Sequence, residues 1–223
     1  MSTGSLNLYK SFTYAQPETY HFSHDSVFLA RNVFEVVRNE SLPATQVLDL
    51  CAGCGIVGLD YAFHSAHELE KATKMDFVEV QKIYEPFLNE NINTFNSLHS
   101  EMLTSRLIFS NYDKLHLDNS LKSRYDLILC NPPYFRTGQG KLSPSEFKNR
   151  CRFFIDSGFE QLIQSISYLL APQGSAFVLL QNLNDHNIDV LDEINKMNLL
   201  SVRNRGLVRA TGLYQLQRLE RVS

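Results

Sequence analysis

The spacing of apolar residues along the chain predicts alternating helices and strands. From Ser23 to Pro43, apolar residues recur every three or four positions, which is typical of an amphipathic helix. The next segments alternate between short apolar, β-branched runs and helical or polar stretches. The predicted strands are residues 46–50, 76–80, 107–110, 125–130 and 175–180. Helices are predicted after the first strand up to about residue 64, and over residues 81–95, 156–170 and 187–197.

The order of these elements predicts one α/β domain. Strands that are apolar along their whole length are typical of a parallel sheet with helices on both faces. Residues 199–219 read as two further strands joined near Ala210, and this C-terminal hairpin would make the sheet mixed at its edge. We therefore expect a mixed seven-stranded sheet in a domain over residues 23–223, preceded by an N-terminal extension over residues 1–22.

Composition is that of an ordinary soluble globular protein. The chain has 223 residues, 43% of them apolar, which is enough for one buried core. It contains no run of 18 apolar residues, so no membrane span is expected. With four cysteines and no basic-then-apolar leader pattern, the expected compartment is the reducing cytoplasm.

Charge is unevenly distributed along the chain. The net charge is −3, yet the stretch from Arg136 to Arg152 holds five basic residues against one glutamate, and the tail from Arg203 to Arg221 holds five arginines against one. The net charge alone argues mildly against a nucleic-acid partner, whereas the separation predicts one or two positive contact surfaces on an acidic body. Ordinary solvated faces are the alternative interpretation.

A glycine-rich loop follows the first predicted strand. Gly53, Gly55 and Gly58 fit the spacing that lets a nucleotide approach the backbone at a helix N-terminus, a pattern that dinucleotide-binding enzymes share. Asp49, at the strand end, would repel a pyrophosphate but attract an ammonium group. This favours S-adenosylmethionine, which has such a group and no phosphate. The alternative role for Asp49 is to cap the loop amides.

Acidic and amide residues at the next strand ends are candidates for binding the ribose and the base of a nucleoside. Glu79 ends the second strand, where a carboxylate can accept hydrogen bonds from both ribose hydroxyls, unless it is only a surface carboxylate at a helix start. Asp113 is placed to accept from an exocyclic adenine amine. Asn111 is the other candidate for that role, and a purely local turn role is the alternative for Asp113.

The fourth predicted strand runs into Asn131, Pro132, Pro133 and Tyr134. The Asn131 amide oxygen and the Pro132 carbonyl can each accept one N–H of a conjugated amine, which directs its lone pair toward a methyl donor. The prolines stiffen the backbone. Tyr134 can stack on a planar group, worth ~1–3 kcal/mol for a base. Ligands of open α/β sheets bind at the carboxyl ends of strands, so this box and the glycine loop should face one crevice.

No metal site is expected. Cys51 and Cys54 have the spacing of half a zinc site, but Cys130 and Cys151 stand in unlike contexts. The histidines show no ligand spacing with a carboxylate partner.

These motifs together resemble the class I, Rossmann-like amino-methyltransferases: residues 49–55, Glu79, and the box from Asn131 to Tyr134. With residues 22–30, they are similar to the bacterial transfer-RNA adenine-N6-methyltransferases that act on adenosine 37 of the valine transfer RNA. The resemblance covers residues 20–215.

The resemblance implies S-adenosylmethionine as cofactor and RNA, in particular transfer RNA, as the partner of the Arg136-to-Arg152 loop and the arginine-rich tail. It also implies that Asp25 lies near the active crevice, although Asp25 could equally cap the first helix. The sequence departs from the family pattern at Cys51 and Cys54 and in the loop over residues 138–140.

Other functions are compatible with parts of the pattern. A protein-glutamine N5-methyltransferase uses the same box but carries a helical N-terminal domain, and only about 45 residues precede the first strand here. A non-catalytic RNA-binding protein could retain the fold, and small-molecule amines or an NAD-dependent reaction are further alternatives. A monomer and a small homo-oligomer are both compatible with the sequence.

Overall fold

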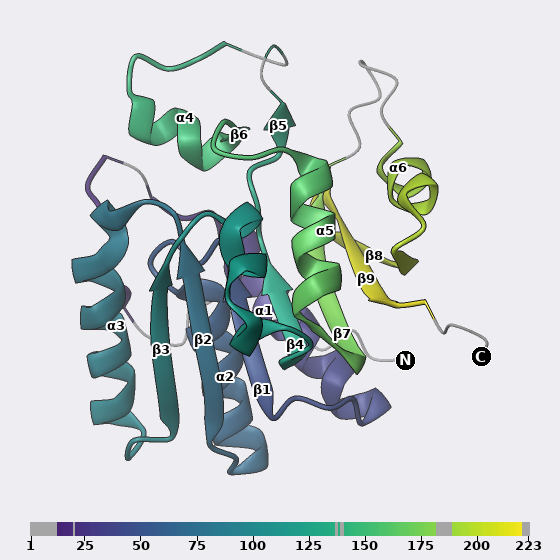
Figure 1. The fold of residues 1–223 in the computed structure, drawn as a ribbon. Coiled ribbons are helices and arrows are strands. Elements are labelled where there is room, and N and C mark those ends of the chain that lie inside the picture. Colours follow the sequence, from purple (N-terminus) through teal and green to yellow (C-terminus); the bar gives the residue numbers. More distant parts are fainter. Residues whose placement is uncertain (1–12, 20, 137, 139–140, 182–188, 220–223) are drawn as a thin grey trace.

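The computed structural model describes residues 13–19, 21–136, 138, 141–181 and 189–219. Its centre is a seven-stranded sheet in the order β3-β2-β1-β4-β7-β9-β8, with helices on both faces (Figure 1). The strands β3, β2, β1, β4 and β7 pair in parallel, and β9 is antiparallel to β7 and to β8. The predicted mixed sheet with a C-terminal hairpin is therefore confirmed. The strands are β1 (Gln46–Leu50), β2 (Thr73–Glu79), β3 (Leu103–Phe109), β4 (Tyr125–Cys130), β7 (Leu170–Leu180), β8 (Leu200–Val208) and β9 (Thr211–Arg218).

Two hydrophobic layers hold the helices on the sheet. Because successive side chains of a strand point to opposite faces, Val47 packs into the layer under α1, α2 and α3, whereas Leu48 packs into the layer under α5 and α6. In Figure 1, α5 crosses in front of the sheet while α1 and α2 lie behind it. The helices are α1 (His24–Glu40), α2 (Ile56–Leu69), α3 (Glu85–Leu98), α4 (Glu146–Arg152), α5 (Phe159–Leu169) and α6 (Val190–Met197).

Short 3-10 turns complete two of the crossovers. They are η1 (Lys82–Tyr84), η2 (Tyr112–Leu117) and η3 (Asn119–Leu121). The helix predicted from residue 81 is divided into η1 and α3, because Pro86 sits at the first turn of α3, where a missing N–H is tolerated.

A small excursion leaves the sheet after β4. The segment holds β5 (Phe135–Arg136), α4 and β6 (Phe153–Phe154), and β5 pairs with β6 in parallel. Figure 1 shows it above the ends of β1 to β4. The apolar pattern did not predict these elements. Neither did it predict the late start of α5, which begins at Phe159 after the N-cap residue Gly158. Asp156, expected in this helix, lies before it and pairs with Arg150.

Other boundaries differ from expectation by up to five residues: α2 extends to Leu69, and β7 begins at Leu170, so residues 171–174 belong to a strand and not to a helix stop. The bounds of β1 and β4 are confirmed, while β2 and β3 begin earlier than predicted because exposed polar residues, Lys74 and Thr104, interrupt their apolar runs. The first two residues of the helix predicted over 187–197 lie outside the described residues, as do residues 1–12 of the predicted extension. The described part of the N-terminal extension packs on the core, where the Tyr14 hydroxyl donates to Asp60 Oδ1 at 2.8 Å. The domain boundary after residue 22 stays a prediction.

Among the described residues, no helix combines the length and the apolarity needed to cross a bilayer.

Close packing under the glycine loop depends on Gly58. A Cβ placed on Gly58 would collide with Met75 Sδ and approach Phe77 Cε1 to 2.8 Å and Asp49 Oδ2 to 2.9 Å. These neighbours belong to β1 and β2, so the start of α2 can lie directly on the sheet only without a side chain at this position.

Replacing Gly58 with alanine should therefore destabilise the fold. We expect Gly58→Ala to lower the free energy of unfolding by about 1–3 kcal/mol, the usual cost of overpacking a core. Urea denaturation followed by circular dichroism measures it. Gly158→Ala is the matched control, because its Cβ would meet only the end of the Gln161 side chain, which can move. Equal stability of the two variants would contradict the packing argument.

Candidate active site at the carboxyl ends of the strands

One cavity of about 290 Å³ opens where the parallel strands end. Parallel pairing aligns Leu50 with Cys130 and with Val78, so the segments that follow β1, β2 and β4 leave the sheet side by side. The cavity is lined by these segments, by the turn after β3, by the first turn of α1 and by the overhanging residues 150–157. The glycine loop and the Asn131 box thus face a single cavity, as the sequence predicts.

The glycine loop turns sharply to form one wall. Gly53 has φ +54° and Gly55 has φ +80°, left-handed values that glycine adopts without strain. Gly53 lines the cavity, whereas Gly55 does not and instead packs inward. A Cβ on Gly55 would approach Phe77 Cε1 to 3.3 Å. Gly53 therefore forms part of the cavity wall, whereas Gly55 allows the loop to pack closely against the core.

Glu79 stands at the end of β2 and reaches the cavity. Its side chain accepts hydrogen bonds from Gly53 N at 2.9 Å and from Gln81 N at 2.8 Å. Burial raises the pKa of this carboxyl above 4.5. The hydrogen bonds that the carboxylate accepts from backbone amides lower the pKa and so oppose this rise. Each oxygen keeps a second lone pair, so the carboxylate can still accept from a diol.

Asp49 does not lie where it could bind an ammonium group in the cavity. It is fully buried, it does not line the cavity, and its Oδ2 accepts from Gly58 N at 2.8 Å. Its Oδ1 finds no hydrogen-bond partner among the described residues. The position corrects the expectation of a direct contact and matches the alternative, in which Asp49 caps the amide at the start of α2.

Asn111, and not Asp113, faces the cavity after β3. Asn111 lines it, and its Nδ2 donates to the Asp156 carbonyl at 2.8 Å. The Asn111 Oδ1 is buried and has no partner within the described part of the chain. Asp113 lies in η2 and does not line the cavity. Asp113 therefore does not line the cavity as the adenine-binding role requires, whereas Asn111 does.

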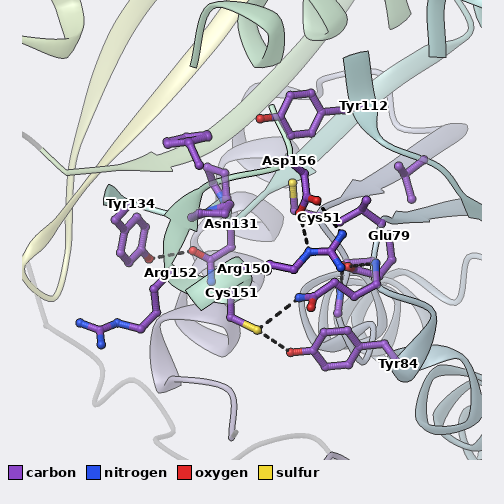
Figure 2. Close-up of a pocket in the computed structure, with 18 of the residues that line it drawn as sticks. Cys51, Glu79, Tyr84, Tyr112, Asn131, Tyr134, Arg150, Cys151, Arg152 and Asp156 are labelled. Carbon is purple, nitrogen blue, oxygen red and sulfur yellow. Dashed lines mark hydrogen bonds and ion pairs between the residues drawn. The ribbon is translucent and has the colours of Figure 1, made fainter. Parts of the chain in front are cut away.

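The Asn131 side chain is held from two sides. Its Nδ2 donates to Ser26 Oγ at 3.0 Å. Its Oδ1 accepts from the Tyr134 hydroxyl at 2.7 Å (Figure 2). Pro132, Pro133 and Tyr134 line the cavity beside it. The sequence did not indicate either contact of Asn131, because Ser26 is 105 positions away and because Tyr134 was expected only to stack.

An arginine–carboxylate pair within the overhanging segment lines the cavity. Arg150 Nε donates to Asp156 Oδ2 at 2.9 Å and its terminal nitrogen donates to Asp156 Oδ1 at 2.6 Å. Figure 2 shows the Arg150 guanidinium between Asp156 and Glu79. The positive charge lowers the pKa of Glu79, a smaller effect than burial. Sequence reasoning noted Arg150 only as part of a basic run.

Three cysteines border the same space without forming a metal centre. Cys51, Cys54 and Cys151 line the cavity, and all are free thiols. The Cys151 Sγ lies 3.2 Å from the Tyr84 hydroxyl. Across the residues that the structure describes, no group of three or more His, Cys, Asp or Glu side chains could hold a metal ion.

The basic residues differ in how far they are available to a partner. Arg136 pairs with Glu193, and the Arg205 side chain is only 9% exposed and donates to Glu40 at 2.6 Å. Arg209 is more open and lies 3.4 Å from Asp25, which lines the cavity as the family resemblance implies. Arg152 is exposed, lines the cavity and forms no ion pair in the described part of the chain. Arg221 lies outside the described residues.

Comparison with known proteins agrees with this architecture. The chain is 28% identical to the tRNA1(Val) (adenine(37)-N6)-methyltransferase of Shewanella frigidimarina over 211 residues, 89% of this chain and 80% of that protein. It is 26% identical to the protein of the same name from Dyadobacter fermentans, over 61% of this chain and 50% of that protein. The chain thus spans only half the length of some curated relatives.

A solved structure shares the fold. The 16S rRNA N2 methyltransferase of Thermus thermophilus, in complex with AdoMet and guanosine, matches 91% of this chain with a TM-score of 0.60 at 16% identity, and the match covers 45% of that protein. The sheet order and the helices on both faces define a class I, Rossmann-like methyltransferase fold. Within that class, the chain belongs to the family described as Conserved hypothetical protein 95, whose model matches residues 26–143.

The buried Asp49 makes stability depend on pH. Burial raises its pKa well above the ordinary 3.8, so between 3.8 and the folded-state pKa the folded protein binds more protons than the unfolded chain, and stability falls as pH rises through that window. Asp49→Asn cannot titrate but keeps an acceptor for Gly58 N. We expect the stability of the variant relative to the unmodified protein to increase with pH across the window. Urea unfolding at several pH values measures this, and a constant difference would contradict the assignment.

Proposed function

We propose that this chain is an S-adenosylmethionine-dependent N-methyltransferase that acts on the exocyclic N6 of adenine in RNA, specifically transfer RNA, in the cytoplasm. The observation that carries the proposal is that Glu79 and Asn131, from two different strand ends, line one cavity. The names of the two similar proteins from Shewanella and Dyadobacter support the adenine-N6 reaction and the transfer-RNA substrate.

The donor half of the cavity fits a nucleoside with an amino acid arm. Glu79 can accept from ribose hydroxyls, and the buried, unpartnered Asn111 Oδ1 can accept from an adenine amine. Gly53 forms part of the cavity wall without a side chain. When bound, S-adenosylmethionine supplies a methyl group on a positively charged sulfur. Asp49 contributes indirectly, by fixing the start of α2 beneath the loop.

The acceptor half positions an NH2 group. Asn131 Oδ1 accepts from the Tyr134 hydroxyl and retains a second lone pair for one N–H of the amine. The carbonyl of Pro132 accepts the other N–H, which leaves the nitrogen lone pair free. Because the nitrogen can release a proton after transfer, no side chain has to act as a base beforehand. The protein lowers the barrier mainly by positioning and electrostatics.

A nucleobase suits this half better than an aliphatic amide. Tyr134 and Phe135 line the cavity next to Asn131, and an aromatic face supports stacking on a planar base, worth ~1–3 kcal/mol. A loop nucleotide of RNA can leave its stack at low cost and enter such a site.

Arg152 is the basic residue best placed to meet the substrate's phosphates. Its guanidinium carbon lies 5.7 Å from the ring centres of both Phe135 and Phe153, which holds the side chain beside the acceptor box. In Figure 2 the guanidinium points away from the other labelled side chains. Arg209, 56% exposed beside Asp25, adds a second charge near the same opening. Arg205 does not fit this role, since Glu40 and Gln215 already engage it.

Removing the Asn131 amide tests the acceptor half. We expect Asn131→Ala to lower turnover of transfer RNA by at least about 100-fold, the scale lost with one positioned transition-state contact. The affinity for S-adenosylhomocysteine, measured by calorimetry, should stay within about twofold, as expected if Asn131 contacts mainly the acceptor. Loss of donor affinity in parallel with turnover would contradict the division of the cavity.

Mass spectrometry of the products identifies the substrate class. Incubation with labelled donor and separate pools of transfer RNA, ribosomal RNA and protein should yield N6-methyladenosine from the transfer RNA. Methylated glutamine without methylated adenosine would overturn the proposal in favour of a protein substrate, and failure to bind the donor would indicate a non-catalytic protein.

Reversing the charge of Arg152 tests the phosphate contact. Arg152→Glu should weaken RNA binding several-fold and reduce the slope of log affinity against log salt by about 1, the effect of one lost phosphate contact. Arg38→Glu is the matched control. This substitution makes the same charge change on α1, at an arginine that already pairs with Glu35 and Glu68. An identical salt dependence for the two variants would exclude Arg152 from the interface.

A further inference from the structure

The first turn of α1 reaches the acceptor box. Ser26 lies in this turn with 6% of its surface exposed, and its backbone N–H donates to the Ser23 carbonyl at 3.2 Å. Its Oγ accepts from Asn131 Nδ2 at 3.0 Å. The adjacent Asp25 lies 3.4 Å from Arg209 of the hairpin turn, so the start of α1 is held against the C-terminal hairpin as well.

The orientation of the Asn131 amide matters for its proposed role. Rotation of the amide by half a turn would exchange oxygen and NH2, and an NH2 group facing the substrate amine would present a donor to a donor. In the structure, Nδ2 is directed to Ser26, and Oδ1 lies on the side of the Tyr134 hydroxyl. Ser26 lines the cavity and is almost entirely buried, so its oxygen is the acceptor that the folded chain itself places beside Nδ2.

We propose that Ser26 is a positioning residue for methyl transfer: its hydroxyl holds the Asn131 amide with the oxygen toward the methyl acceptor. This inference rests on the proposed function for its catalytic consequence, while the amide contact itself is a property of the folded chain. Ser26 acts through Asn131 and need not touch the substrate.

The kinetic signature of this role is a change in turnover alone. Ser26→Ala should lower kcat about tenfold, the loss of one hydrogen bond that orients a reacting group. The dissociation constants for RNA and S-adenosylhomocysteine and the melting temperature should stay close to those of the unmodified protein. Ser26→Thr, which keeps the hydroxyl, should restore most of the turnover.

Ser65→Ala provides the matched control, since Ser65 is a buried serine of α2 that does not line the cavity. Its kcat should equal that of the unmodified protein. If Ser26→Ala matched this control in kcat, or lost donor affinity and melting temperature together with turnover, the positioning role would be overturned.

A second measurement is independent of the substrate. The side-chain amide of Asn131 can be assigned by NMR as the signal missing from Asn131→Ala, and its hydrogen exchange with solvent can then be followed. We expect exchange at least about tenfold faster in Ser26→Ala than in the unmodified protein, as the amide loses its buried acceptor. Unchanged exchange would overturn the proposal. The result holds even if the methylated product proves to be glutamine, so failure of the proposed function is distinguishable from failure of this inference.

Discussion

Parallel pairing of β1 with both β2 and β4 is the constraint on which the rest of the structure depends. Strands paired in parallel end at the same edge of the sheet. Residues that follow different strands therefore come together through the strand pairing and need no direct contact with each other. Glu79 and Asn131 reach one cavity for this reason. The buried faces of these strands, packed against α1–α3 on one side and α5 on the other, keep that edge in place.

The loop above this edge is stabilised by carboxylates that accept backbone amides. Asp49 caps the start of α2 and Glu79 accepts from Gly53, so both acids tie the glycine loop to the sheet. Burial raises the pKa of both groups. The free-energy cost of burying these two carboxyl groups is compatible with a fold that is only marginally stable overall. The loop that they hold forms a rigid wall at which a nucleoside can lie against the backbone. On the opposite wall, Ser26 and Tyr134 hold the Asn131 amide.

Much of the fold could be predicted from the sequence because local patterns determine it. Apolar runs located β1 and β4, and the motif spacing located Glu79 and Asn131 at strand ends. The sequence could not place Asp49 beneath the loop instead of in the cavity, since a residue at a strand end points to either face according to register. It also could not reveal the Ser26–Asn131 contact or the Arg150–Asp156 pair, because these depend on how separate elements pack.

A crystal structure with S-adenosylhomocysteine and adenosine tests most directly whether one cavity serves both the donor and the acceptor. We expect the ribose hydroxyls within hydrogen-bonding distance of Glu79 and the adenosine N6 within hydrogen-bonding distance of Asn131 Oδ1. Density for the two molecules on different faces of the protein, or an adenosine that does not contact Asn131, would contradict it.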